Sequence, residues 1–162
     1  MEKKKELFNS PTHGQQSLME VVEEIRGFIN EKPDYLYHLI IGTDSQKRQG
    51  KLNMVSAIII YRENNGGRYF WRKKQDPCSK SLRNKMWRET LTSLKLAHEL
   101  LPILQKNLNG KDYELAIHID VGNAGPTRVM IKELVAIVND NGFIAKTKPE
   151  SYGASSVADR YT

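Results

Sequence analysis

The part of the chain that decides the fold is residues 35–72, which read YLYHLIIGTDSQKRQGKLNMVSAIIIYRENNGGRYFWR. The β-branched and aromatic side chains in this stretch predict strands over residues 35–43, 51–62 and 68–72. The run Asn64-Asn65-Gly66-Gly67 between the last two strands is typical of a tight hairpin turn. We therefore expect these three strands to form an antiparallel meander.

Helices and strands alternate on the C-terminal side of this meander. Periodicity and stop signals predict helices over residues 81–106, 126–141 and 152–162. Pro102 is expected to bend or break the first of these helices near its end. Apolar runs predict strands over residues 113–120 and 143–148. The sequence therefore predicts an α/β fold in which a five-stranded mixed sheet, the meander plus two further parallel strands, is flanked by helices.

Residues 1–33 form an N-terminal extension in which we expect one helix. Ser17 and Glu20 have the spacing of a capping box, and Val21, Ile25 and Phe28 lie on one helical stripe after it. The 162 residues suit one domain with a real hydrophobic core. We found no linker or repeat, and we therefore expect residues 1–162 to form a single domain.

The composition excludes several classes of protein. Cys78 is the one cysteine in the chain, so a disulfide framework and a cysteine-based zinc site are both excluded. No His or Asn is placed to support Cys78 as a nucleophile. No run approaches the roughly 18 apolar residues of a membrane span, and the charged start lacks an apolar signal core. These features predict a cytoplasmic protein that does not bind membranes.

The charge balance favours a polyanionic partner. The chain has 25 Lys and Arg against 19 Asp and Glu, for a net charge of +6. Between residues 68 and 95 there are nine basic residues and two acids. An ordinary solvated face explains such a stretch equally well. The candidate nucleic-acid-binding residues in this stretch are Lys73, Lys74, Lys80, Arg83, Lys85 and Arg88.

Two acidic residues follow predicted buried strands. Asp44 comes soon after the apolar run of residues 39–41, and Asp120 directly follows Ile119. Asp44 taken alone is also a common turn residue. If the two strands are parallel neighbours, the two carboxylates lie close together. Like charges at that spacing require a cation or a shared proton.

Two further acids lie on predicted helices. On a helical wheel, Glu89 falls within about 20° of Leu96 and Leu100, inside the apolar stripe. A carboxylate that faces a core is costly unless it binds a metal or pairs with a buried Arg or Lys. Asp159 lies among small residues of the last helix, although an exposed pair with Arg160 is the simpler alternative. Oxygen-rich clusters of this kind suit Mg²⁺ or Mn²⁺.

The order of elements and of the four acids Asp44, Glu89, Asp120 and Asp159 resembles the ribonuclease H fold. Three segments carry a closer resemblance, namely IGTDSQ at residues 41–46, HIDVGN at residues 118–123 and ASSVADR at residues 154–160. They are similar to those of the YkuK-type family, a group of small bacterial ribonuclease H-like proteins. The resemblance covers nearly the whole chain.

The resemblance implies a metal-dependent nuclease that cleaves RNA, an RNA–DNA hybrid or structured DNA with two Mg²⁺ or Mn²⁺ ions. Asp44 would bridge the two ions, and Asp159 would help to hold the ion that activates water. Glu89 and Asp120 would hold the ion near the leaving oxygen.

The sequence also departs from the ribonuclease H pattern. Enzymes of this fold often carry a His in a loop before the last helix, and residues 146–153 contain none. His118 shares the strand parity of Asp120 and is either a supporting residue of the site or a buried strand residue. Two alternatives to a nuclease therefore stay open. One is a non-catalytic nucleic-acid-binding or scaffold protein, and the other is a nucleotide-binding domain with a phosphate loop at residues 120–125.

Overall fold

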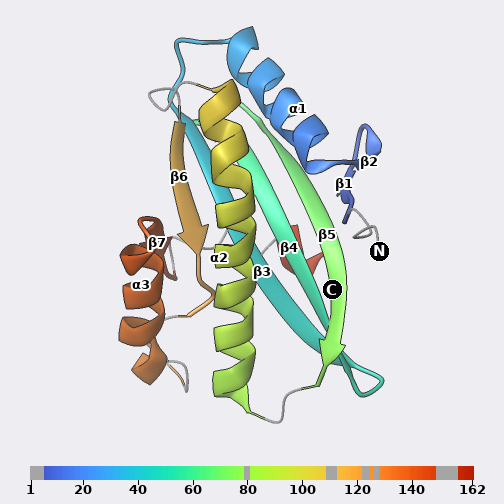
Figure 1. The fold of residues 1–162 in the computed structure, drawn as a ribbon, viewed down its shortest axis with the longest axis vertical. Coiled ribbons are helices and arrows are strands. Elements are labelled where there is room, and N and C mark those ends of the chain that lie inside the picture. Colours follow the sequence, from blue (N-terminus) through green and yellow to red (C-terminus); the bar gives the residue numbers. More distant parts are fainter. Residues whose placement is uncertain (1–5, 79–80, 109–112, 122–124, 126–127, 149–156) are drawn as a thin grey trace.

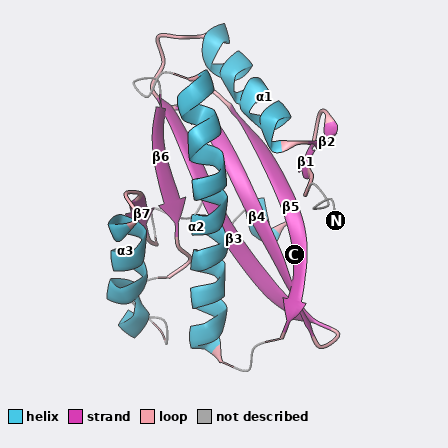
Figure 2. Ribbon diagram, viewed as in Figure 1, coloured by secondary structure: helices cyan, strands magenta, loops and turns pink. Residues whose placement is uncertain are grey.

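The structure, a computed structural model, describes residues 6–78, 81–108, 113–121, 125, 128–148 and 157–162. Among these residues, seven strands form one mixed sheet, with the strand order β2-β1-β5-β4-β3-β6-β7 (Figures 1 and 2). In chain order the elements are β1 (Phe8–Ser10), β2 (Gly14–Gln16), α1 (Leu18–Glu31), β3 (Tyr37–Arg48), β4 (Lys51–Arg62), β5 (Gly67–Pro77), α2 (Leu82–Asn107), β6 (Tyr113–His118), the 3₁₀ turn η1 (Arg128–Met130), α3 (Ile131–Asp140) and β7 (Ile144–Lys146).

The predicted fold class is confirmed, with seven strands rather than five. Strands β3, β4 and β5 form the antiparallel meander, and β6 and β7 extend the sheet in parallel from β3. The N-terminal extension adds β1 and β2, which pair with each other and reach β5 where Asn9 lies opposite Trp71. The helix expected in this extension is present as α1, whereas its two short strands were not predicted. Strands of three residues are too short to show a periodicity, and edge pairing with β5 orders them.

The sheet has two faces that are covered by different parts of the chain. Side chains alternate along each strand, so Ile41 and Ile58 point to the face that α1, α2 and α3 cover, here called the helical face. Val55 and Ala57 point to the opposite face, where they pack with Ala158 of the C-terminal residues. We call this second face the C-terminal face. Figure 1 shows the C-terminal segment behind the sheet, on the far side from α2.

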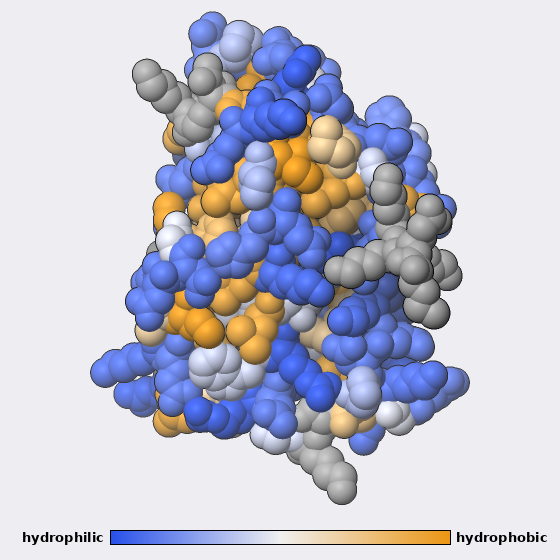
Figure 3. All heavy atoms as spheres, viewed as in Figure 1, coloured by the Kyte–Doolittle hydropathy of each residue, from blue (hydrophilic) through white to orange (hydrophobic). Residues whose placement is uncertain are grey.

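The helices follow the local sequence closely. The Ser17 hydroxyl accepts from the Glu20 N–H at 3.2 Å and the Glu20 carboxylate accepts from the Ser17 N–H at 3.1 Å, so the predicted capping box is present. Helix α2 continues past Pro102 to Asn107, and the expected break does not occur. On the helical face, hydrophilic residues cover most of the outer surface and apolar side chains show between the helices (Figure 3). None of the described helices is long and apolar enough to cross a membrane.

Strand β3 extends beyond the end of its parallel neighbour β6. The parallel pairing of β3 and β6 ends at Gly42, opposite His118, whereas β3 continues to Arg48 with β4 as its partner. Among the strands that the structure describes, residues 43–48 therefore have a neighbour on one side only. The predicted strand end at residue 43 was wrong because the polar residues after it still pair with β4. The predicted strand end at residue 120 was also wrong, since β6 ends two residues earlier at His118.

Other boundaries also differ from the expected ones. Strand β5 runs on to Pro77 rather than ending at residue 72, because it pairs with the full length of β4. Of the predicted last helix, residues 157–159 are helical, and residues 152–156 lie outside the described residues.

Candidate metal-binding carboxylate site

Asp44 lies within β3 at the start of the part that β6 no longer flanks. Its side chain belongs to the C-terminal face, since its cross-strand partner is Val55, and it is 8% exposed. Burial raises the pKa of the Asp44 carboxyl, and the charges of Asp120 and Asp159 raise it further. The charge of Lys85 and the backbone N–H of Ser45 act in the opposite direction. Asp44 is therefore a buried acid that is repelled by the charges of two other carboxylates.

Glu89 is buried in the middle of α2, as the helical wheel predicts, and is 4% exposed. Its Oε1 accepts a hydrogen bond of 2.5 Å from the Ser45 hydroxyl and lies 3.5 Å from the Lys85 ammonium. Burial is the main reason that the pKa of Glu89 rises to about 7, and the charges of Asp44 and Asp120 add to it. The contacts with Ser45 and Lys85 offset part of this rise. The carboxyl is consequently poised to exchange a proton near neutral pH.

Asp120 lies two residues beyond β6, in register with the position of Asp44 two residues beyond Gly42. Its Oδ1 is 2.8 Å from the ammonium of Lys148, which follows β7. The β6–β7 contact continues past the paired residues, because the Lys148 N–H donates to the Val121 carbonyl at 2.9 Å. The parallel neighbours β3 and β6 thus bring Asp44 and Asp120 to the same end of the sheet, as expected from the sequence.

Asp159 comes from the C-terminal residues. The Gln46 amide donates a hydrogen bond of 2.9 Å to its Oδ1. Gln46 and Ser45 are consecutive residues of a strand, so their side chains point to opposite faces of the sheet. Asp159 therefore approaches Gln46 from the C-terminal face, while Glu89 approaches Ser45 from the helical face.

The four predicted acids come from four separate parts of the chain and gather around the free edge of β3. Their donor atoms are all carboxylate oxygens, which is the set that Mg²⁺ and Mn²⁺ prefer. Within the described part of the chain, no three His, Cys, Asp or Glu side chains lie close enough to hold one ion. Lys85 and Lys148 instead pair with Glu89 and Asp120. The donor set fits a divalent cation, which would compete with these two ammonium groups.

Sequence reasoning missed three residues that support these acids, namely Ser45, Gln46 and Lys148. Ser45 and Gln46 directly follow Asp44. They were missed because the strand was expected to end at residue 43, whereas β3 continues to Arg48. Lys148 was detectable in principle. Strand β7 pairs in parallel with β6, with His118 opposite Lys146, so a residue two positions further along β7 falls beside Asp120.

The predicted basic stretch does not form one continuous surface. Arg83 pairs with Glu133 at 2.7 Å, and Lys74 pairs with Asp76 at 3.7 Å. Arg88 donates to the Pro77 carbonyl at 2.6 Å.

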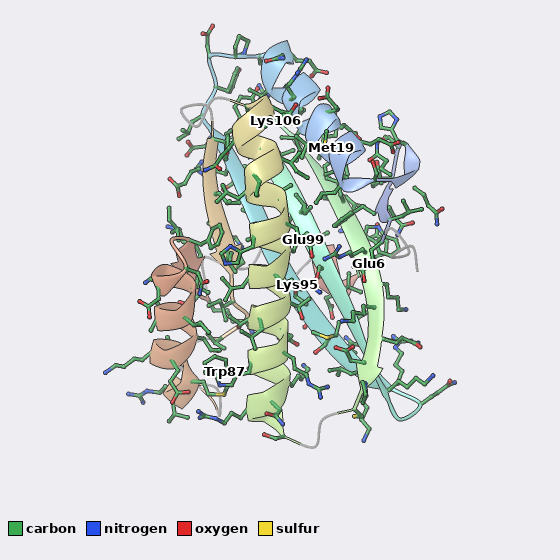
Figure 4. All side chains as sticks on the ribbon, in the orientation of Figure 1. Glu6, Met19, Trp87, Lys95, Glu99 and Lys106 are labelled. Atoms are coloured by element: carbon green, nitrogen blue, oxygen red, sulfur yellow. The ribbon has the colours of Figure 1, made fainter. Side chains whose placement is uncertain are left out.

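The remaining members of the stretch are scattered as well. Lys85 lies inside the carboxylate site, Lys73 is exposed on the C-terminal face, and Lys80 is outside the described residues. Figure 4 shows Glu99 of α2 and Glu6 on the helical face, and Arg72 pairs with both, at 3.7 and 3.1 Å. Several cations of this stretch are therefore neutralised by internal ion pairs, and the described ones lie on both faces of the sheet.

Two other predicted features are only partly placed. His118 is half-buried on the C-terminal face, where it lines a cavity of about 280 Å³ together with His38 and Tyr61. The proposed phosphate loop at residues 120–125 lies largely outside the described residues, since 122–124 are not described.

Comparison with known proteins places the chain in a family. A family model described as "Ribonuclease H-like" matches residues 20–162. A relative from Bacillus subtilis (strain 168), named "Uncharacterized protein YkuK", is 30% identical over 169 residues that cover 96% of each chain. No solved structure matches the chain. The match to the family model spans strands β3 to β7, nearly all of the helical residues and the four acids described above, and the chain belongs to the ribonuclease H-like family.

Proposed function

We propose that this protein is a metal-dependent nuclease that hydrolyses phosphodiester bonds in RNA, an RNA–DNA hybrid or structured DNA. The observation that carries the proposal is the gathering of Asp44, Glu89, Asp120 and Asp159 at one free strand edge. Their mutual repulsion contributes to the raised pKa of Asp44 and of Glu89. This repulsion between carboxylates destabilises the fold, and a bound cation would offset the destabilisation.

The four carboxylates would hold two Mg²⁺ or Mn²⁺ ions, with Asp44 in the central position. When bound, such ions supply Lewis-acid stabilisation of a phosphodiester and a more acidic water. The chain supplies the positioning. The Ser45 hydroxyl fixes the Glu89 carboxylate on one face, and the Gln46 amide fixes Asp159 on the other. Both contacts come from side chains of β3, whose backbone is held in place by its pairing with β4.

The two lysines have a different role in this proposal. Lys85 and Lys148 neutralise part of the carboxylate charge in the absence of a cation. Lys148 is about half exposed, with 54% of its side chain accessible, so it can leave Asp120 at little cost. A free ammonium at the edge of the site could then pair with a phosphate of the substrate.

The same two ion pairs favour a second candidate function. A site that is neutralised by its own lysines needs no metal for stability, and a ribonuclease H-like domain without catalysis would keep the fold as a nucleic-acid-binding or scaffold protein. This candidate predicts salt-dependent binding of nucleic acid without cleavage.

A cleavage panel tests the proposal. Single-stranded RNA, RNA–DNA hybrid, double-stranded DNA and a four-way junction are incubated with the protein in Mg²⁺, in Mn²⁺ and in EDTA. We expect metal-dependent cleavage of at least one substrate. The variant Asp44→Asn should lose it and should also lose Mn²⁺ binding, measured by electron paramagnetic resonance.

The matched control is Asp140→Asn, the same change at an exposed position at the end of α3. It should cleave like the unaltered protein, and thermal unfolding should show that both variants are folded. Cleavage that persists in Asp44→Asn, or a folded protein that cuts none of the substrates, would overturn the nuclease proposal.

A further inference from the structure

A polar surface extends from the carboxylate site along the C-terminal face of the sheet. Cross-strand partners share a face, so the register places the amides of Gln46, Asn53 and Gln75 in one row across β3, β4 and β5. The Gln75 amide donates to the Asn53 side-chain oxygen at 3.1 Å, and the Gln46 amide donates to Asp159. This row of amides therefore begins at a candidate metal-binding residue and leads away from it.

Two cations continue the surface beyond the amide row. Arg48 and Lys51 are the last paired residues of β3 and β4 and lie on the same face as the amides. Gln49 and Gly50 between them both have positive φ, at 50° and 74°, as in a two-residue type I′ hairpin turn. This tight turn holds the two cations side by side. A cavity of about 520 Å³ is lined by Arg48, Gln49, Lys51, Asn53 and Gln75.

The cations of this surface form no ion pair with a carboxylate in the described part of the chain. Arg48, Lys51 and Lys73 are exposed, and none of them has a carboxylate partner among the residues that the structure describes. Arg72, Lys74, Arg83 and Lys85 of the basic stretch, in contrast, are paired with carboxylates. Cations that the protein does not neutralise itself are the ones available to an anionic ligand.

The spacing suits a polynucleotide. Arg48 lies four residues after Asp44 in β3, which is a distance of about 13 Å along a strand. A duplex whose axis follows β3 rises by about 3.4 Å per nucleotide of each strand, so this span covers about four nucleotides measured along that axis. Amides offer hydrogen bonds to phosphate and sugar oxygens, and Arg and Lys pair with phosphates.

We propose that this surface, formed by Gln46, Arg48, Lys51, Lys73 and Gln75 over the buried side chain of Asn53 and here called the hairpin platform, holds the sugar–phosphate backbone of a nucleic-acid strand whose scissile phosphate lies at the carboxylates. The inference rests on the proposed function for the position of that scissile phosphate. It assigns substrate binding to the end of the β3–β4 hairpin, rather than to the basic stretch of β5 and α2.

A binding experiment tests the platform separately from cleavage. Fluorescein-labelled 20-nucleotide RNA and DNA of one sequence are titrated with the protein in EDTA, and fluorescence anisotropy is recorded at several salt concentrations. The platform variant carries Arg48→Gln, Lys51→Gln and Lys73→Gln. The matched control carries Arg26→Gln, Lys106→Gln and Lys132→Gln, three exposed helical positions with the same change of net charge.

We expect the platform variant to bind both probes about 10-fold or more weakly than the control does at moderate salt. Loss of three phosphate contacts to a single strand should lower the slope of log affinity against log salt by about 2. Equal affinities of the two variants would overturn the inference, as would no binding of either probe by the unaltered protein.

The outcome is distinguishable from that of the nuclease proposal. In EDTA, Asp44→Asn should bind both probes no more weakly than the unaltered protein does, because loss of a carboxylate lowers the repulsion of the phosphates. Binding that depends on the platform in a protein that never cleaves would support the inference and overturn the nuclease proposal. Undiminished binding by the platform variant in a protein that cleaves would overturn the inference and support the nuclease proposal.

Discussion

The two halves of β3 share one strand but have different neighbours. Residues 37–42 lie between β4 and β6, and Leu39 and Ile41 are fully buried in the main core. Residues 43–48 have β4 as their one neighbour among the described strands, and there Asp44 and Ser45 are buried although they are polar. The difference teaches that polar side chains can be placed in a buried strand at the point where one flanking strand ends. Side chains from both faces can then approach the free edge.

The largest expected effect breaks the core half of the strand. Ile41→Ala should lower the free energy of unfolding by about 4 kcal/mol, because it leaves a cavity where the side chain packs under α2. Urea denaturation measures this as a shift of the midpoint without a change in slope. Gln46→Ala in the other half should cost less than about 1 kcal/mol. Similar losses for the two variants would contradict the proposed contrast between the halves.

A second prediction uses the raised pKa of Glu89. An acid whose folded pKa exceeds its unfolded pKa leaves stability unaffected below the unfolded value and lowers it above the folded one. The metal-free protein should therefore lose stability as pH rises from about 4.5 to about 7, the unfolded and folded pKa of Glu89. Glu89→Gln should remove this loss and raise the free energy of unfolding at pH 8 by up to about 3 kcal/mol.

Urea denaturation at pH 4.5 and pH 8 in EDTA measures this effect. The matched control is Glu63→Gln, the same change at an exposed position, which should leave the pH profile unaltered. A Glu89→Gln variant with the pH profile of the unaltered protein would rule out the assigned cause.

The smallest expected effect on stability is that of Lys148→Gln. The pair with Asp120 is partly exposed on both sides, so its loss should change the free energy of unfolding by less than about 1 kcal/mol. The ammonium competes with a metal for Asp120, and its removal should therefore strengthen Mn²⁺ binding several-fold. Calorimetric titration with Mn²⁺ measures this, with Lys132→Gln as the control. Weaker Mn²⁺ binding by Lys148→Gln would show that the lysine supports the metal rather than competing with it.

Local signals in the sequence predicted a large part of this structure. The capping box of Ser17 and Glu20 is a contact between residues three apart, and the burial of Glu89 follows from helical periodicity alone. The hairpin at residues 63–66 follows from its turn residues, of which Asn64 and Gly66 have positive φ. Each of these features depends on residues within a few turns of one another, so the sequence displays them directly.

Other features depend on partners far away in the sequence. Residues 44–48 are polar and show no strand pattern, yet they are a strand because β4 pairs with them. Strands β1 and β2 exist because β5 has a free edge. The pair of Lys148 with Asp120 requires β7 to lie beside β6.

The sequence by itself determined the kinds and the order of the main elements from α1 onward and pointed to four candidate acids, because periodicity and capping are local properties of the chain. Only the tertiary structure decided that Ser45 and Gln46 hold Glu89 and Asp159 from opposite faces of one strand. It also decided which cations are consumed by internal ion pairs and which, at Arg48 and Lys51, face solvent. These outcomes depend on register and on the distance between charges, which are fixed only when the strands have paired.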